Sequence, residues 1–136
     1  MQKYSHTLTI DGNNFNDLEG FYNEIARVFT DGSFPIGHNL DALNDLLIGG
    51  NGVYKVGEPV LIRWENANKS KIDLGYNATA NYYDSRMKKC HPSNRAIFQK
   101  NLDDAKSYTG DTLFDIICKM LDQNKDLIHN CNLVLL

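Results

Sequence analysis

The sequence predicts an α/β fold in which a three-stranded parallel sheet packs against helices. Two observations support this: three short apolar segments suit strands, and the elements follow the order strand, helix, helix, strand, helix, strand. Strands separated by helices pair in parallel through crossover connections. With 136 residues, of which 42% are hydrophobic and 23% charged, the chain can bury one core, so we expect a single domain over residues 1–136.

The first strand and the first helix occupy the first thirty residues. Residues 6–10 alternate in polarity and end at a turn, as a half-buried strand does. Residues 18–29 repeat apolar side chains at three- and four-residue spacing, which predicts a helix with one buried face. We expect Asn16 to cap this helix, with Glu19 three residues later in the capping-box position.

The sequence GHNLDALNDLL at residues 37–47 predicts a second, shorter helix, with Asn39 as its N-cap and a glycine run after its end. Leucines at helical spacing form its inward side: Leu40, Leu43 and Leu47. Residues three or four apart share a face of a helix, and this places four residues together on the other side: Asp41, Asn44, Asp45 and Ile48.

The second half of the chain supplies the remaining elements. Residues 59–64, PVLIRW, are continuously apolar up to an arginine, which favours a strand buried on both faces. Residues 113–121 carry an apolar helical stripe with Asp111 as the expected cap, and residues 132–136 predict the last strand. Between them, residues 72–110 have helical composition with weak apolar stripes, so we expect an insert of one or two surface helices before the last helix.

The second helix has an unusual charge balance, because no lysine or arginine occurs from Val28 to Tyr54. Asp41 lies in the first helical turn, where the helix dipole stabilises an acid by roughly 0.3–1 kcal/mol. Asp45 lies beyond that turn, with no cation three or four residues away and a like charge at Asp41. The pair is either a solvated helix face or two carboxylates held out for a cationic partner.

Composition excludes several classes of function. A formal charge of −3 and an isoelectric point near 5.7 argue against direct binding of nucleic acid or an anionic membrane. No stretch is apolar for long enough to span a bilayer, and the three cysteines form no C-x-x-C motif. We therefore expect a cytoplasmic protein without a metal or another cofactor.

Two other functions remain as alternatives to a binding face for a cationic partner. The first is a small hydrolase using His38, Asp41 and Asp45, although no second cluster offers further metal ligands at motif spacing. General acid–base catalysis also needs two carboxyl groups in different environments, which one exposed helix face does not provide. The second alternative is a regulatory module that binds another basic protein through the same helix.

Residues 36–47, IGHNLDALNDLL, resemble the second-helix signature of the barstar family, intracellular inhibitors of bacterial ribonucleases. The signature is Gly-x-Asn-Leu-Asp-Ala-Leu-x-Asp-x-Leu, and the chain matches it at Gly37, Asn39, Leu40, Asp41, Ala42, Leu43, Asp45 and Leu47. Residues 8–29, 59–71, 113–123 and 132–136 look like the flanking strands and helices of that family. The resemblance covers about two thirds of the chain and implies a three-stranded parallel sheet packed with helices.

The resemblance also implies a stoichiometric inhibitor whose second helix, with the loop before it, fills the cationic active site of a ribonuclease. Asp45 matches the aspartate that takes the phosphate position, and Asp41 matches the acid one turn earlier. The implied contact surface also includes Ile36, Gly37, His38, Asn39, Asn44 and Ile48. A phosphate mimic must not be neutralised by its own chain, so the absence of nearby lysine and arginine is then expected.

Three departures from the family pattern bear on the target. Ile36 stands where an aromatic residue usually precedes the glycine, and Asn44 replaces a partner-facing tryptophan. Lys119 falls where a third carboxylate is expected on the last helix. These changes favour a ribonuclease toxin other than barnase, delivered between competing bacteria in contact-dependent inhibition, with this chain as its immunity protein and monomeric when free. Residues 72–110 exceed the short family members and form either specificity contacts or inert surface helices.

Overall fold

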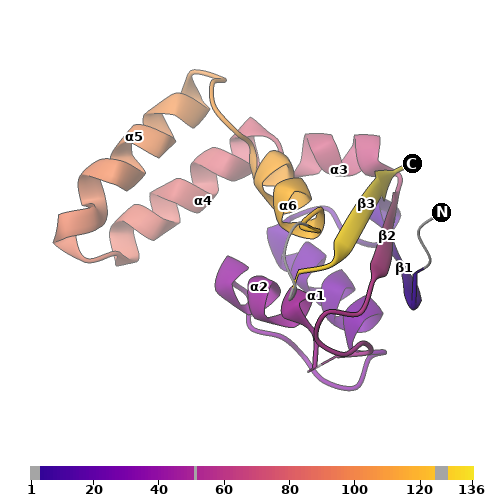
Figure 1. Ribbon diagram of the computed structural model, residues 1–136. Coiled ribbons are helices and arrows are strands. Elements are labelled where there is room, and N and C mark those ends of the chain that lie inside the picture. The colour runs from indigo at the N-terminus through magenta and orange to yellow at the C-terminus, as the bar shows by residue number, and fades with distance from the viewer. Residues whose placement is uncertain (1–3, 51, 125–128) are drawn as a thin grey trace.

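The computed structural model describes residues 4–50, 52–124 and 129–136 and has the predicted α/β architecture (Figure 1). The elements in chain order are β1 (His6–Asp11), the 3-10 helix η1 (Gly12–Asn14), α1 (Leu18–Phe29), α2 (Leu40–Ile48), β2 (Val60–Glu65), α3 (Ala67–Asp73), α4 (Tyr76–Lys89), the 3-10 helix η2 (Pro92–Asn94), α5 (Arg95–Lys106), α6 (Leu113–Leu121) and β3 (Cys131–Leu135). The strands pair in parallel in the order β1-β2-β3, which confirms the expected sheet.

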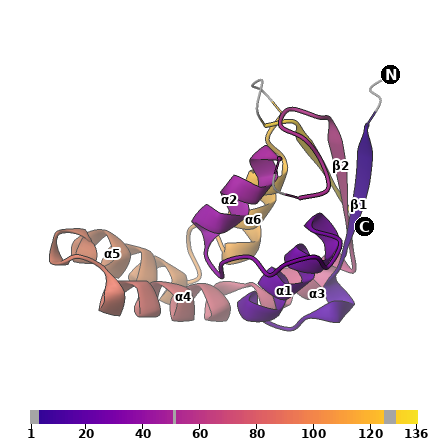
Figure 2. The same cartoon turned by 90° about the horizontal axis from the view of Figure 1, so that it is seen from below.

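The sheet buries one face only. Val60, Ile62 and Trp64 alternate along β2 and are fully buried, whereas Arg63 between them is exposed. Figure 2 shows α1, α2 and α6 on the same side of the sheet. The expectation of a strand buried on both faces is therefore wrong, because these helices cover one face and the alternate side chains of β2 point to the other.

Two helix caps lie one residue later than predicted. Asp17, not Asn16, caps α1, since its carboxylate accepts a hydrogen bond from the Gly20 amide at 2.8 Å. Thr112, not Asp111, caps α6 and forms a capping box with Asp115. In both cases the neighbouring polar residue that was expected to act as the cap bonds a lysine instead.

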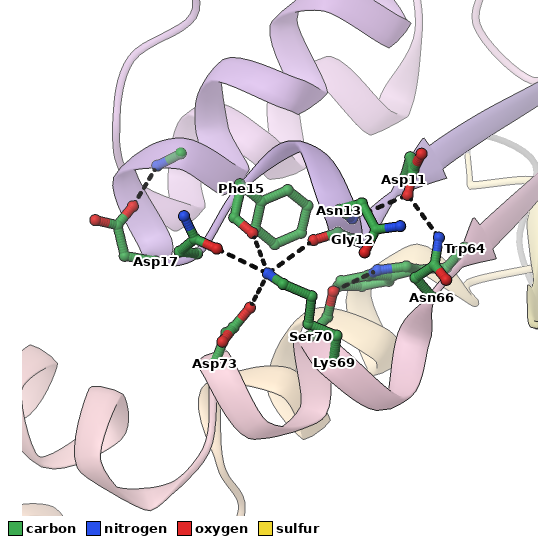
Figure 3. A network of polar contacts seen from close by, with 12 residues as sticks. Asp11, Gly12, Asn13, Phe15, Asp17, Trp64, Asn66, Lys69, Ser70 and Asp73 are labelled. Atoms are coloured by element: carbon green, nitrogen blue, oxygen red, sulfur yellow. Dashed lines mark hydrogen bonds and ion pairs between the residues drawn. The ribbon is translucent and has the colours of Figure 1, made fainter.

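A network of polar contacts ties α3 to the chain between β1 and α1 (Figure 3). The Lys69 ammonium lies within hydrogen-bond distance of four oxygens: the carbonyls of Gly12 (3.1 Å) and Phe15 (2.6 Å) and the side chains of Asn16 (2.9 Å) and Asp73 (2.6 Å). Beside it, Trp64 donates its indole N–H to Ser70 Oγ at 3.0 Å. These contacts hold α3 against the segment that precedes α1 and against the end of β2.

Residues 76–106 form a helical hairpin in which α4 and α5 pack on each other and extend away from the sheet (Figures 1 and 2). The prediction of surface helices before the last helix is confirmed. Thr79, buried on α4, joins the hairpin to α6 because its hydroxyl accepts a hydrogen bond from the Leu113 amide at 2.8 Å. Apart from this base, most of α4 is exposed or half-buried, which explains its weak apolar stripe.

Candidate protein-binding site

The candidate site is centred on α2, which the core holds in a fixed orientation. Leu43 and Leu47 are at most 1% exposed, as predicted, and Leu46 is buried as well. The Asn39 side chain accepts a hydrogen bond from the Ala42 amide at 2.7 Å, which confirms it as the N-cap. The helix ends at Gly49, whose positive φ of 103° favours glycine.

The four residues predicted on the far side of α2 do lie away from the core, and we call them the outer face of α2. Asp41 and Asp45 are exposed, while Asn44 and Ile48 are half-buried. Neither aspartate forms an ion pair with any residue that the structure describes. Two carboxylates one turn apart are thus open to solvent or to a partner.

The loop before α2 packs against α1. Ile36 is half-buried against the core, and Gly37 and His38 are exposed. The His38 ring stacks on Tyr22 with 5.3 Å between ring centroids, and its Nδ1 contacts the Glu19 carboxylate. These contacts place the loop and the start of α2 on one continuous surface.

A cleft of about 440 Å³ lies between α1, the start of α2 and α4. Glu19 and Asp41 line it on the side of α1 and α2, Arg86 and Lys89 line it on the side of α4, and Tyr22 also contributes to the lining. Burial raises the pKa of Tyr22 far above its ordinary value, so its hydroxyl keeps its proton and can act as a donor. Sequence reasoning missed this cleft because no motif places residue 86 beside residue 41.

The structure separates the three residues of the hydrolase alternative. His38 and Asp41 line the cleft, but Asp45 lies outside it, one turn further along α2. Across residues 4–50, 52–124 and 129–136, no three histidine, cysteine, aspartate or glutamate side chains are grouped to hold a metal ion. The arrangement therefore provides a contact surface in which charges of both signs are open to a partner.

Comparison with known protein families decides the class. A family model described as Barstar (barnase inhibitor) matches residues 5–126. The chain belongs to the barstar family. The match runs from β1 through α6 and includes the α4–α5 hairpin, which confirms the resemblance seen in the second helix. A search of curated proteins found no match.

Barstar-family members are inhibitors rather than enzymes, so the family places the chain among proteins of the ribonuclease-inhibitor type. The hydrolase alternative is accordingly set aside. No helix in the described part of the chain is long and apolar enough to cross a membrane. At the position where the barstar pattern led us to expect a third carboxylate, Lys119 forms an ion pair with Asp111 at 2.6 Å.

Proposed function

We propose that the chain is the immunity protein of a bacterial ribonuclease toxin, and that the outer face of α2 fills the toxin's cationic active site. The observation that supports this most is the pair Asp41 and Asp45, exposed one turn apart and unpaired among the described residues of a barstar-family chain. A ribonuclease holds RNA phosphates with basic side chains. Two carboxylates on one helix face can occupy those positions in place of phosphate.

The rigidity of α2 supports tight binding. Its buried leucines and its Asn39 cap orient the two carboxylates before the partner arrives, which lowers the entropic cost of association. In this proposal Asp45 enters the phosphate position and Asp41 reinforces it from one turn earlier. The rest of the contact comes from the outer face and the preceding loop: Ile36, Gly37, His38, Asn39, Asn44 and Ile48.

The departures from the family pattern bear on the choice of target. Asn44 is a smaller, polar contact than an aromatic residue, and Lys119 brings a positive charge where a carboxylate is expected. A surface altered in this way suits a ribonuclease whose active-site rim differs from that of barnase. We therefore propose a toxin delivered between competing bacteria as the target, with the chain acting as a monomer in the cytoplasm.

Inhibition of RNA cleavage tests this function. The probes are any ribonuclease-like domain found to be encoded beside the chain's own gene, called the toxin domain below, and, for comparison, barnase. We expect cleavage by the toxin domain to fall linearly to zero at one inhibitor per nuclease, while the chain alone cleaves no RNA. Failure to inhibit either nuclease would reject the proposal, and binding without inhibition would indicate a regulatory module instead.

Substitution tests the role of Asp45 in the same assay. Asp45→Ala should weaken the complex by at least about 2 kcal/mol, the usual size for a residue that dominates an interface. Its circular dichroism spectrum and melting temperature should match those of the wild type, because the side chain is exposed. An unchanged dissociation constant would show that α2 does not bind in the way proposed.

A further inference from the structure

The lining of the cleft beside α2 includes a buried hydroxyl group that forms no hydrogen bond with any described residue. Tyr22 is 1% exposed and lines the cleft, and its hydroxyl has no hydrogen-bond partner among the described residues. Buried hydroxyl groups nearly always have a partner, so each exception calls for an explanation. The hydroxyl oxygen has almost no accessible surface, so an acceptor atom of a partner would reach it only if the cleft opens on binding.

The two walls of the cleft carry opposite charges. Glu19 and Asp41 lie on the wall formed by α1 and α2, and Arg86 and Lys89 lie on the wall formed by α4. The Arg86 guanidinium sits 5.4 Å from the centre of the Phe98 ring, a cation–π contact with α5. Neither cation forms an ion pair with a residue in the described ranges.

Because the two walls carry opposite charges, a protein segment is a better occupant of the cleft than a free anion. A free phosphate bound to the cations of α4 would face the carboxylates on the other wall, and this repulsion would oppose its binding. A loop of a protein can instead place a carboxylate beside α4 while its basic side chains face α2. The cleft also continues into the proposed inhibitory surface, because His38, Asn39 and Asp41 line it.

We propose that this cleft receives a carboxylate-bearing loop of the same ribonuclease. The loop's carboxylate pairs with Arg86 and Lys89, and one of its oxygens accepts a hydrogen bond from the Tyr22 hydroxyl once the side chains that cover this hydroxyl move aside on binding. The α4–α5 hairpin is then part of the inhibitor's contact surface rather than an inert addition. This inference rests on the proposed function and adds to it a second contact, of opposite charge to the first.

Charge reversal on α4 tests the cleft, with the toxin domain of the inhibition assay as the probe. The double variant Arg86→Glu/Lys89→Glu should bind about tenfold more weakly or worse, because like charges then meet across the interface. The matched control is Lys88→Glu, which reverses a charge in the same helical turn but outside the cleft. The control should stay within about twofold of the wild type, as expected for a charge outside the contact.

The outcomes separate this inference from the proposed function. If Asp45→Ala loses affinity but the double variant binds like the wild type, the cleft is not a contact and only the inference fails. If the wild type inhibits neither nuclease, the function fails and the inference fails with it. If inorganic phosphate alone raises the melting temperature, and the double variant abolishes that shift, the cleft binds a free anion and the inference is overturned.

Tyr22→Phe gives an independent test because it removes only the hydroxyl. We expect affinity for the toxin domain to fall about three- to tenfold, the usual scale for one lost hydrogen bond. The free variant should melt at the same temperature as the wild type or higher, since a buried unpaired hydroxyl has been removed. Unchanged affinity would show that the hydroxyl does not contact the toxin and would overturn its assigned role.

Discussion

The acids of α2 and two acids of the α4–α5 hairpin, Asp84 and Asp104, lie on helices of the same chain but have different surroundings. In the hairpin, Asp84 and Asp104 each pair with a lysine on their own helix, four residues away, at 2.9 and 3.9 Å. On α2, Asp41 and Asp45 pair with no described residue. A lysine one turn from an acid is a common and favourable arrangement, and its absence on α2 supports the proposal that this helix faces a partner's cations.

The two regions also differ in how deeply the apolar side chains Leu43 and Ile97 are buried. Leu43 on α2 is fully buried, whereas Ile97 on α5 is 62% exposed. Leu43→Ala should therefore lower the free energy of unfolding by about 2–5 kcal/mol, the range for a core leucine. Ile97→Ala should change it by no more than about 0.5 kcal/mol. Urea unfolding of both variants checks this contrast, and equal losses would contradict the idea that α2 is the better anchored of the two.

Glu24 is an acid in a third kind of environment, because its side chain is buried. The carboxylate accepts hydrogen bonds from Arg27 Nε at 2.8 Å, the Asp11 amide at 2.9 Å and Asn14 Nδ2 at 3.0 Å. Burial alone would raise the pKa of Glu24, but these bonds outweigh it and hold the pKa below its ordinary value. We expect Glu24→Gln to cost about 1–3 kcal/mol at neutral pH.

The pH dependence of this stability has a definite sign. A carboxyl group whose pKa is lower in the folded state stabilises the fold above its ordinary pKa, and that contribution is lost as pH falls through the folded-state pKa. The difference in unfolding free energy between the wild type and Glu24→Gln should therefore shrink as the solution is acidified below the ordinary glutamate range. A difference that stays constant with pH would show that ionised Glu24 does not support the fold.

The smallest effect belongs to the paired acids of the hairpin. Asp84→Ala breaks a surface ion pair whose members are both largely exposed, so it should change the unfolding free energy by no more than about 0.5 kcal/mol. It should leave binding of the toxin domain unchanged, since Asp84 belongs to α4 and does not line the cleft. A marked loss of affinity in Asp84→Ala would show that acids paired within the chain contribute to binding as well, and would contradict the contrast drawn with α2.

Apolar periodicity was enough to predict most of the fold. It placed the three strands and the helices α1, α2 and α6, because each depends on local spacing, and residue type at the helix start predicted the Asn39 cap. The short helix α3 was not predicted. The errors came from competition between neighbours. Asn16 and Asp17 are both good caps, and sequence alone does not show that Lys69, more than fifty residues away, binds Asn16. The exposed second face of β2 was missed because Leu61 made an alternating strand look continuously apolar.

The candidate site likewise has one part that the sequence predicts and one part that it does not. The acids of α2 and the lack of lysine or arginine around them are visible in the sequence, because both are local. The cleft cannot be predicted from the sequence, since it depends on how the α4–α5 hairpin is oriented relative to α1 and α2. This orientation places Arg86 and Asp41 in the same cleft. Tyr22 lies on the buried face of α1, within the apolar stripe predicted over residues 18–29, but no local pattern predicts that its hydroxyl has no partner there.

Removing one negative charge without changing side-chain size tests the central claim most directly. The measurement is the dissociation constant of the toxin-domain complex for Asp45→Asn, beside Asp84→Asn as the control. If an exposed, unpaired carboxylate on α2 substitutes for RNA phosphate, Asp45→Asn should raise the dissociation constant about 30-fold or more, and Asp84→Asn by less than about twofold. Equal, small changes in both variants would contradict the account.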